Sequence, residues 1–199
     1  MLSAQNLSYR RGDKIILADL SFALARGEGL VIAGANGSGK TTLLKILAGL
    51  LAPESGKLEL DGTDIIGGKS AEYLGRILYL GHKNAMNEEL TVLDNLKFWA
   101  GLAGNEILIP AALAYFALEE YALMPYKTLS HGLKRRVALA RLIFSQKDIW
   151  LLDEPFANLD GETGERLANL IATRRQNGMV ILSSHQAVAL ENFKELRLE

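Results

Sequence analysis

A glycine-rich run, placed between an apolar stretch and a helix-like stretch, constrains the fold of this chain more than any other feature. The run fits the pattern G-x-x-x-x-G-K-[ST] and comprises Gly34, Ala35, Asn36, Gly37, Ser38, Gly39, Lys40 and Thr41, followed by Thr42. Residues 29–33 read as a buried parallel strand, and residues 43–50 place Leu and Ile at helical spacing. Glycines let successive backbone N–H groups point at phosphate oxygens beside the positive end of such a helix. The run therefore predicts an α/β fold with a nucleoside triphosphate site.

Several side chains have the chemistry that a triphosphate and Mg²⁺ need. Lys40 would reach the β- and γ-phosphates, and the Thr41 hydroxyl would offer an oxygen to Mg²⁺. An oxygen donor on the opposite side of the ion is expected from Asp153, which follows the apolar run 149–152. Its neighbour Glu154 is a candidate base for the attacking water. The alternative is a pair of solvated acids that open a turn.

Gly34, Asp153 and His185 each follow an apolar run at a position where a parallel strand would end. Ligands of open parallel sheets gather at the carboxyl ends of the strands. We therefore expect these residues to lie in one site. For His185 taken alone, a structural role would be the more usual interpretation.

Composition limits the classes of function. The 199 residues are 49% apolar and 23% charged with a formal net charge of −1, so no basic excess favours a nucleic-acid partner. The chain has no cysteine, which excludes disulfides and thiolate chemistry. Its first residues lack the features of an export signal, and no window approaches the ~18 apolar residues of a membrane-spanning helix. We therefore expect any membrane role to act through a partner.

The order of predicted elements indicates a single domain, residues 1–199, with an insertion. Strand-like runs come first, at 14–17, 20–24, 57–60 and 76–80. Helix-like segments follow, at 91–102, 111–123 and 133–145. Alternation then returns, with a strand at 148–154, a helix at 166–176 and a strand at 179–185. We predict a catalytic core from residues 1–82 and 146–199, and a helical subdomain of about 83–145.

A further motif, residues 129–136 with Ser130 and Gly132, stands shortly before the Asp153 strand. Ser130 could simply cap the helix that follows. Taken with the other motifs and their order, however, the chain resembles an ABC-type ATPase cassette along essentially its whole length. The resemblance implies an α/β P-loop NTPase fold of the ABC cassette type. Such a fold has a RecA-like mixed-sheet core, an antiparallel β part and an inserted helical subdomain.

The resemblance also implies roles for individual residues, with ATP and Mg²⁺ as the cofactors. Tyr9 would stack on adenine, and His185 would contact the γ-phosphate. Two copies would form a head-to-tail homodimer across the nucleotide, in which Ser130 and Gly132 of one copy face the phosphate loop of the other. Asp160 would touch the facing protomer.

Two positions depart from the family pattern. The family's signature is Leu-Ser-Gly-Gly-Gln, whereas His131 and Leu133 replace its second glycine and its glutamine here. At the position of the family's Q-loop glutamine stands His82. An imidazole there could meet Mg²⁺ or water, although Mg²⁺ prefers oxygen ligands. Alternatively, His82 is a loop residue on the surface that docks a membrane subunit.

Residues 80–82, 89–98 and 135–142 further resemble the ATPase subunits of cytochrome c maturation complexes, which are haem exporters. This resemblance implies integral membrane subunits as partners and a peripheral location on the cytoplasmic face of the inner membrane. It implies coupling of ATP hydrolysis to haem export or to release of a haem-loaded chaperone. The alternatives are the ATPase of another small-substrate exporter and a soluble, non-transport ABC ATPase. A P-loop kinase or GTPase fits poorly, because no guanine-reading Asn-Lys-x-Asp is present.

Overall fold

The computed structural model describes residues 1–66, 70–186 and 190–199. Contacts within the chain divide it into two compact units. The first, here called the sheet unit, consists of Met1–His82, Lys147–Pro155 and Ile171–Glu199. The second, the helical unit, consists of Lys83–Gln146 and Phe156–Leu170. This differs from the division predicted from sequence, in which residues 156–170 belong to the core.

One sheet of the sheet unit is antiparallel, with strand order β2-β1-β4-β5. Its strands are β1 (Leu2–Arg11), β2 (Lys14–Leu24), β4 (Ser55–Leu60) and β5 (Thr63–Asp64). The runs expected at 14–17 and 20–24 form one continuous strand, because register shifts against β1 absorb the irregular residues between them. Asp61 and Gly62 make the β4–β5 turn with φ of 52° and 81°, as a type I′ hairpin turn requires.

The other sheet is parallel, with strand order β6-β7-β8-β3-β9. Its strands are β3 (Gly29–Ala33), β6 (Ile77–Leu80), β7 (Ile149–Leu152), β8 (Met179–Ser184) and β9 (Phe193–Arg197). Every residue of β7 and β8 is buried, which explains their continuous apolar runs. Because the strands run in the same direction, the residues that follow β3, β6, β7 and β8 meet along one edge. Strand β9 was not predicted from sequence.

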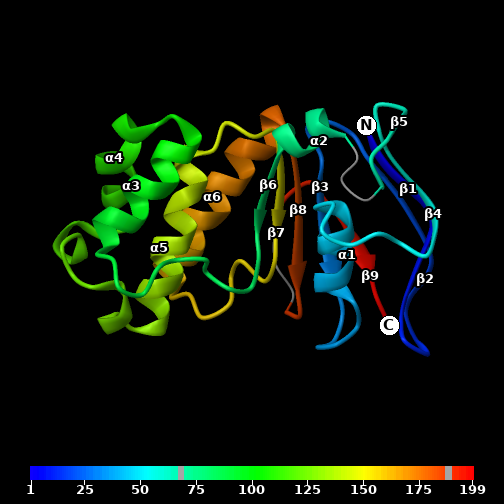
Figure 1. The fold of residues 1–199 in the computed structure, drawn as a ribbon, viewed down its shortest axis with the longest axis horizontal. Helices are drawn as coiled ribbons and strands as arrows, with labels where there is room; N and C mark the ends of the chain where they lie inside the picture. Colours follow the sequence, from blue (N-terminus) through cyan, green and yellow to red (C-terminus); the bar gives the residue numbers. More distant parts are fainter. Residues whose placement is uncertain (67–69, 187–189) are drawn as a thin grey trace. The chain divides into compact units, whose positions relative to one another are not determined.

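Helix α1 (Lys40–Leu47) lies between the two sheets (Figure 1). Its apolar side chains join a single buried cluster with residues of both sheets, including Leu2, Leu7, Leu24, Leu58, Leu30, Ile32, Leu151 and Ile181. A buried side chain of this size contributes about 1.5–3 kcal/mol. The phosphate loop is therefore held between a well-packed strand and a well-packed helix. A short helix, α2 (Ala71–Arg76), precedes β6.

The helical unit is built from α3 (Val92–Ala103), α4 (Ile109–Tyr115) and α5 (His131–Phe144), with short 3-10 turns at Glu106–Leu108, Glu119–Tyr121 and Tyr126–Thr128. Helix α6 (Gly161–Asn177) begins in this unit and continues into the sheet unit. Thr91 caps α3 by accepting a hydrogen bond from the Asp94 N–H at 3.0 Å, as its sequence predicts. Among the described residues, no helix combines the length and the hydropathy that crossing a bilayer requires.

The helix predicted at 111–123 is wrong in its length, since α4 ends at Tyr115. Phe116 and Leu118 are 1% and 0% exposed. Two residues that are two positions apart point in very different directions on an α-helix, so both could not be buried on one face. The chain instead turns at Ala117, whose φ is 50°, and buries both side chains. Helix propensity was overruled here by packing.

Candidate functional site

The phosphate loop connects the end of β3 to the start of α1, as its sequence pattern predicts. Gly34, Gly37 and Gly39 have φ of 153°, 86° and 102°, a region that residues with a side chain rarely adopt. A Cβ atom on Gly34 would also lie 2.5 Å from the backbone oxygen of Leu198. The glycine at this position is therefore required both by conformation and by space. Ala35, Asn36 and Gly37 form the exposed rim of the loop.

Lys40 is only 6% exposed, and its ammonium group lies inside the curl of the loop. Its Nζ donates hydrogen bonds to the carbonyl oxygens of Gly34 at 2.8 Å and Ala35 at 3.0 Å. Nζ also lies 3.5 Å from Oε1 of Glu154. A buried cation held in this way places a fixed positive charge where the loop presents its N–H groups.

Thr41 and Asp153 bring hydroxyl and carboxylate oxygens together next to Lys40. The Thr41 Oγ1 donates to the two carboxylate oxygens of Asp153 at 2.9 and 3.1 Å. Asp153 is 1% exposed, and it follows the buried strand β7. Hard oxygen donors of this kind are the ligands that Mg²⁺ takes from proteins, usually as one or two carboxylates beside substrate phosphates. The residues present therefore fit a magnesium ion.

Glu154 and His185 face each other across the ends of β7 and β8. The His185 Nδ1 lies 2.9 Å from Oε2 of Glu154, and the His185 backbone N–H points at the same oxygen from 3.4 Å. Glu154 has a φ of 46°, a conformation that costs a residue with a side chain about 1–3 kcal/mol. That turn aims the carboxylate at Lys40 on one side and at His185 on the other. Strained residues of this kind concentrate at functional sites.

Tyr9 and His82 are the other two residues predicted in the sheet unit. Tyr9 lies in β1, opposite Leu17, and is half-buried against the apolar cluster. His82 is exposed and lies two residues beyond β6. The end of β6 is close to Asp153, whose N–H donates to the Leu80 carbonyl oxygen at 2.8 Å.

Sequence reasoning missed Ser183, which is fully buried on β8. Its hydroxyl donates to Oδ1 of Asp153 at 2.7 Å and accepts from the Glu154 N–H at 2.8 Å. The signal that could have revealed it was the change from apolar residues to Ser183 and Ser184 at the end of this strand, just before His185.

In the helical unit, Ser130 caps α5 by accepting a hydrogen bond from the Leu133 N–H at 3.3 Å. Ser130 and His131 are exposed, and Gly132 is half-buried. A Cβ on Gly132 would meet the Asn158 backbone oxygen at 3.7 Å, an ordinary contact. The N-terminus of α5 therefore presents its N–H groups at the surface, where an anion can be bound.

Asp160, also in the helical unit, immediately precedes α6 and caps it. Its Oδ1 accepts a hydrogen bond from the Thr163 N–H at 2.8 Å, and its Oδ2 forms an ion pair with Arg136. The Thr163 N–H and, next, the Arg136 guanidinium lower the pKa of Asp160 well below its usual range. The Asp160 carboxylate therefore has a structural role within its own chain.

We expect Asp160→Ala to lower the free energy of unfolding by about 1 kcal/mol at pH 7, because helix caps contribute about that much. Asp160→Asn should cost less, since asparagine caps equally well and only the charge is lost. Because the folded-state pKa is lowered, the contribution of the charge is present above the unfolded pKa, about 3.9. The difference between wild type and the Asn variant should therefore shrink as the pH falls below that value. Urea unfolding of the nucleotide-free chain measures both effects, and an Ala variant as stable as wild type would contradict them.

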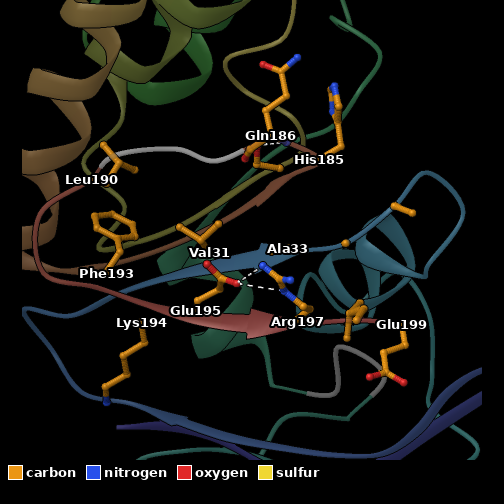
Figure 2. A pocket seen from close by; sticks show the side chains of 14 residues that line it. Val31, Ala33, His185, Gln186, Leu190, Phe193, Lys194, Glu195, Arg197 and Glu199 are labelled. Atoms are coloured by element: carbon orange, nitrogen blue, oxygen red, sulfur yellow. Dashed lines mark hydrogen bonds and ion pairs between the residues drawn. The ribbon is translucent and has the colours of Figure 1, made fainter.

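A cavity of about 490 Å³ lies beside the phosphate loop and is lined by residues of the paired strands β3 and β9. Figure 2 shows Val31 and Ala33 of β3 in its wall, with His185 at one end. Leu30 and Ile32 belong to the cluster around α1, and side chains alternate along a strand. The cavity therefore lies on the opposite face of the parallel sheet from α1. Of the phosphate-loop residues, Gly34 and Ala35 line it, so it is not the space that the loop encloses.

Comparison with known proteins agrees with this architecture. The cytochrome c biogenesis ATP-binding export protein CcmA of Wolbachia pipientis wMel is 45% identical over 188 residues, which cover 94% of this chain and 90% of that protein. A solved ATP-binding subunit of an ABC transporter aligns over all of this chain and 88% of its own, with a TM-score of 0.83 and 26% identity. An ATP-binding cassette solved as a dimer in a post-hydrolysis state, bound to ADP and Pi, has the same fold, with a TM-score of 0.82, 23% identity and coverage of 100% and 97%.

The fold predicted from sequence is thereby confirmed, including its antiparallel and parallel sheets. A family profile for ABC transporters matches residues 17–157, which include the phosphate loop, the α5 N-terminus, Asp153 and Glu154. The chain belongs to the ABC transporter family of ATP-binding proteins, and within it to the ATP-binding export proteins of cytochrome c biogenesis.

Proposed function

We propose that this chain is the ATP-hydrolysing subunit of an export complex for cytochrome c biogenesis, coupling hydrolysis to haem export or to release of a haem-loaded chaperone. The observation that carries the proposal is the contact chain from Lys40 through Glu154 to His185, beside the Thr41–Asp153 pair. Phosphoryl transfer is catalysed mainly by positioning the reactants and by stabilising charge, and these groups can do both. The cytochrome c biogenesis role is supported by the similarity to CcmA.

Nucleotide binding would use the phosphate loop for the phosphates and Tyr9 for the base. The N–H groups of residues 34–42 would hold the β- and γ-phosphates with the Lys40 ammonium, and Tyr9 would stack on the adenine ring. Thr41 and Asp153 would hold Mg²⁺, with His82 as a further ligand, directly or through water. When bound, Mg²⁺ neutralises charge that develops on the transferred phosphoryl group. Lys40 adds a positive charge that the protein fixes in place.

Hydrolysis would depend on Glu154 and His185. A carboxylate that accepts a proton from water must lie near the γ-phosphate, and Glu154 lies within 3.5 Å of the lysine proposed to bind that phosphate. His185 would hold the Glu154 carboxylate in this orientation through its 2.9 Å contact and would itself touch the γ-phosphate. In this arrangement Lys40 and His185 limit the conformations of the base from both sides.

We further propose that the site is completed by a second copy of the chain. Ser130 and Gly132 at the α5 N-terminus would bind the γ-phosphate held by the partner subunit, and Asp160 would contact that subunit. Ser130 and Asp160 are exposed, as an interface between subunits requires. The related cassette solved as a dimer supports this proposal.

The helical unit offers an apolar surface for a membrane partner. A groove of about 410 Å³ is lined by Ala85, Met86, Asn87, Leu90, Asn95, Phe98 and Trp99. Phe98 and Leu102 lie one helical turn apart on α3 and are 58% and 67% exposed. We propose that a cytoplasmic helix of an integral membrane subunit docks here. That would make the chain a peripheral protein on the cytoplasmic face of the inner membrane.

The proposal is tested by isolating the tagged chain from membranes and by scoring a deletion strain for c-type cytochromes. We expect integral membrane proteins to copurify, and we expect covalent haem staining of c-type cytochromes to disappear on deletion. Wild-type chain should restore the staining. Normal cytochromes together with loss of another exported compound would instead identify the ATPase of a different exporter.

A further inference from the structure

We infer that Ser183 is a positioning residue that fixes Asp153 and Glu154 relative to each other and thereby sets the magnesium dependence of hydrolysis. The inference rests on the proposed function, since it concerns how the same site is held in its working geometry. In this role Ser183 does not itself touch nucleotide or the attacking water. It acts through the two acids.

The buried hydroxyl of Ser183 forms hydrogen bonds with both Asp153 and Glu154. Ser183 is 0% exposed, donates to Oδ1 of Asp153 at 2.7 Å, and accepts from the backbone N–H of Glu154 at 2.8 Å. A hydroxyl can donate one hydrogen bond and accept others, so both bonds are compatible. The side chain of one acid and the main chain of the next are therefore tied to the same atom.

The bond to Asp153 determines how its carboxylate is rotated. The terminal torsion of an aspartate is broad, so burial by itself does not choose which oxygen points where. Ser183 holds Oδ1, while the Thr41 hydroxyl makes its shorter contact, 2.9 Å, with Oδ2. The carboxylate is thus held by hydroxyl groups from two elements, Ser183 of β8 and Thr41 of α1.

The bond to Glu154 holds a strained turn. Glu154 has a φ of 46°, which its side chain disfavours, and its N–H is anchored on Ser183 Oγ. This turn directs the Glu154 carboxylate to Lys40 and His185. Loss of the anchor would allow the carboxylate to leave that position without any change in the acid itself.

Strand β8 is well placed to transmit this constraint. It pairs with β3, which leads into the phosphate loop, and with β7, which leads into the two acids. Ser183 lies opposite Ile32 in the β3 register and two residues before His185. One strand therefore carries both the hydroxyl that holds the acids and the imidazole that contacts Glu154.

The test compares the full-length chain with Ser183→Ala, Ser183→Thr and the control Ser184→Ala. Ser184 is adjacent, but its hydroxyl bonds to the backbone of Gln186 rather than to either acid. Removing a group that orients a metal ligand usually costs about 10–100-fold in metal affinity or activity. We therefore expect Ser183→Ala to lower kcat and to raise the Mg²⁺ concentration at half-maximal rate, each by about tenfold or more. Ser183→Thr should keep both near wild type, and Ser184→Ala should change neither.

A second readout does not depend on turnover. Binding of a fluorescent ATP analogue is titrated in excess EDTA and again with rising Mg²⁺. We expect Ser183→Ala to match wild type in EDTA and to lose the increase in affinity that Mg²⁺ gives. A lower unfolding temperature with an unchanged Mg²⁺ midpoint would show a purely structural role and overturn the inference. If the Ala variant does not fold, Ser183→Cys, which keeps the volume and a weak donor, takes its place. We expect the Cys variant to have a higher Mg²⁺ midpoint than wild type, and a wild-type midpoint in it contradicts the inference.

Different results would refute the proposed function and the role of Ser183. A wild-type chain that neither binds nor hydrolyses ATP would refute the proposed function and this inference with it. A wild-type chain that hydrolyses ATP with Mg²⁺, beside a Ser183→Ala variant with wild-type Mg²⁺ dependence, would refute the inference alone.

Discussion

Replacement of Glu154 by Gln is expected to reduce steady-state ATP hydrolysis by about 10²–10⁴-fold, the range that a positioned general base contributes. An amide has the shape of a carboxylate but cannot accept the proton of the attacking water. The variant should still bind ATP, because Lys40 and the phosphate loop are unchanged. It should therefore accumulate as an ATP-bound dimer, which size-exclusion chromatography with Mg·ATP detects as a shift from monomer to dimer.

The matched control is Glu165→Gln, which makes the same chemical change on an exposed residue of α6. It should hydrolyse ATP like wild type and should not accumulate as a dimer. Wild-type turnover in Glu154→Gln would remove Glu154 as the base. Loss of turnover without a stable dimer, in a variant that binds ATP, would contradict the closed, two-copy site.

The second large effect is expected for Lys40→Met. The substitution keeps the apolar stem of the side chain and removes the ammonium group that lies 2.8 and 3.0 Å from two loop carbonyls. Hydrogen bonds to charged groups contribute about 1.5–3 kcal/mol, and about 1.4 kcal/mol corresponds to a factor of ten. We therefore expect ATP affinity to fall by about 10–100-fold. Equilibrium binding of a fluorescent ATP analogue measures the change.

Lys45→Met, on the same helix, is the control for loss of a lysine from α1. It should bind ATP like wild type. Because Lys40 is buried beside Glu154, its loss should also lower the unfolding temperature, so affinity is compared at a temperature where both variants are folded. Unchanged ATP affinity in folded Lys40→Met would exclude Lys40 from the phosphate site.

The helix caps and strand ends were predictable from sequence because each depends on neighbouring residues. Thr91 and Ser130 were expected at helix starts, and both accept a backbone hydrogen bond within three residues. The apolar runs before Asp153 and His185 correspond to β7 and β8. Strand β9 has no such signal, since its burial pattern is mostly exposed, and it forms because it can pair with β3.

The sequence by itself determined the phosphate loop, the order of the motifs and the residue types that can serve a triphosphate, because these follow from short-range spacing and conformational preference. Only the tertiary structure decided that Ser183 holds Asp153, 30 positions away, and that Glu154 takes a strained turn toward Lys40 and His185. It also ended α4 at Tyr115, where packing of Phe116 and Leu118 outweighs helix propensity. The physical reason is the same in each case: these features depend on contacts between segments that are distant along the chain, and local preference contains no information about them.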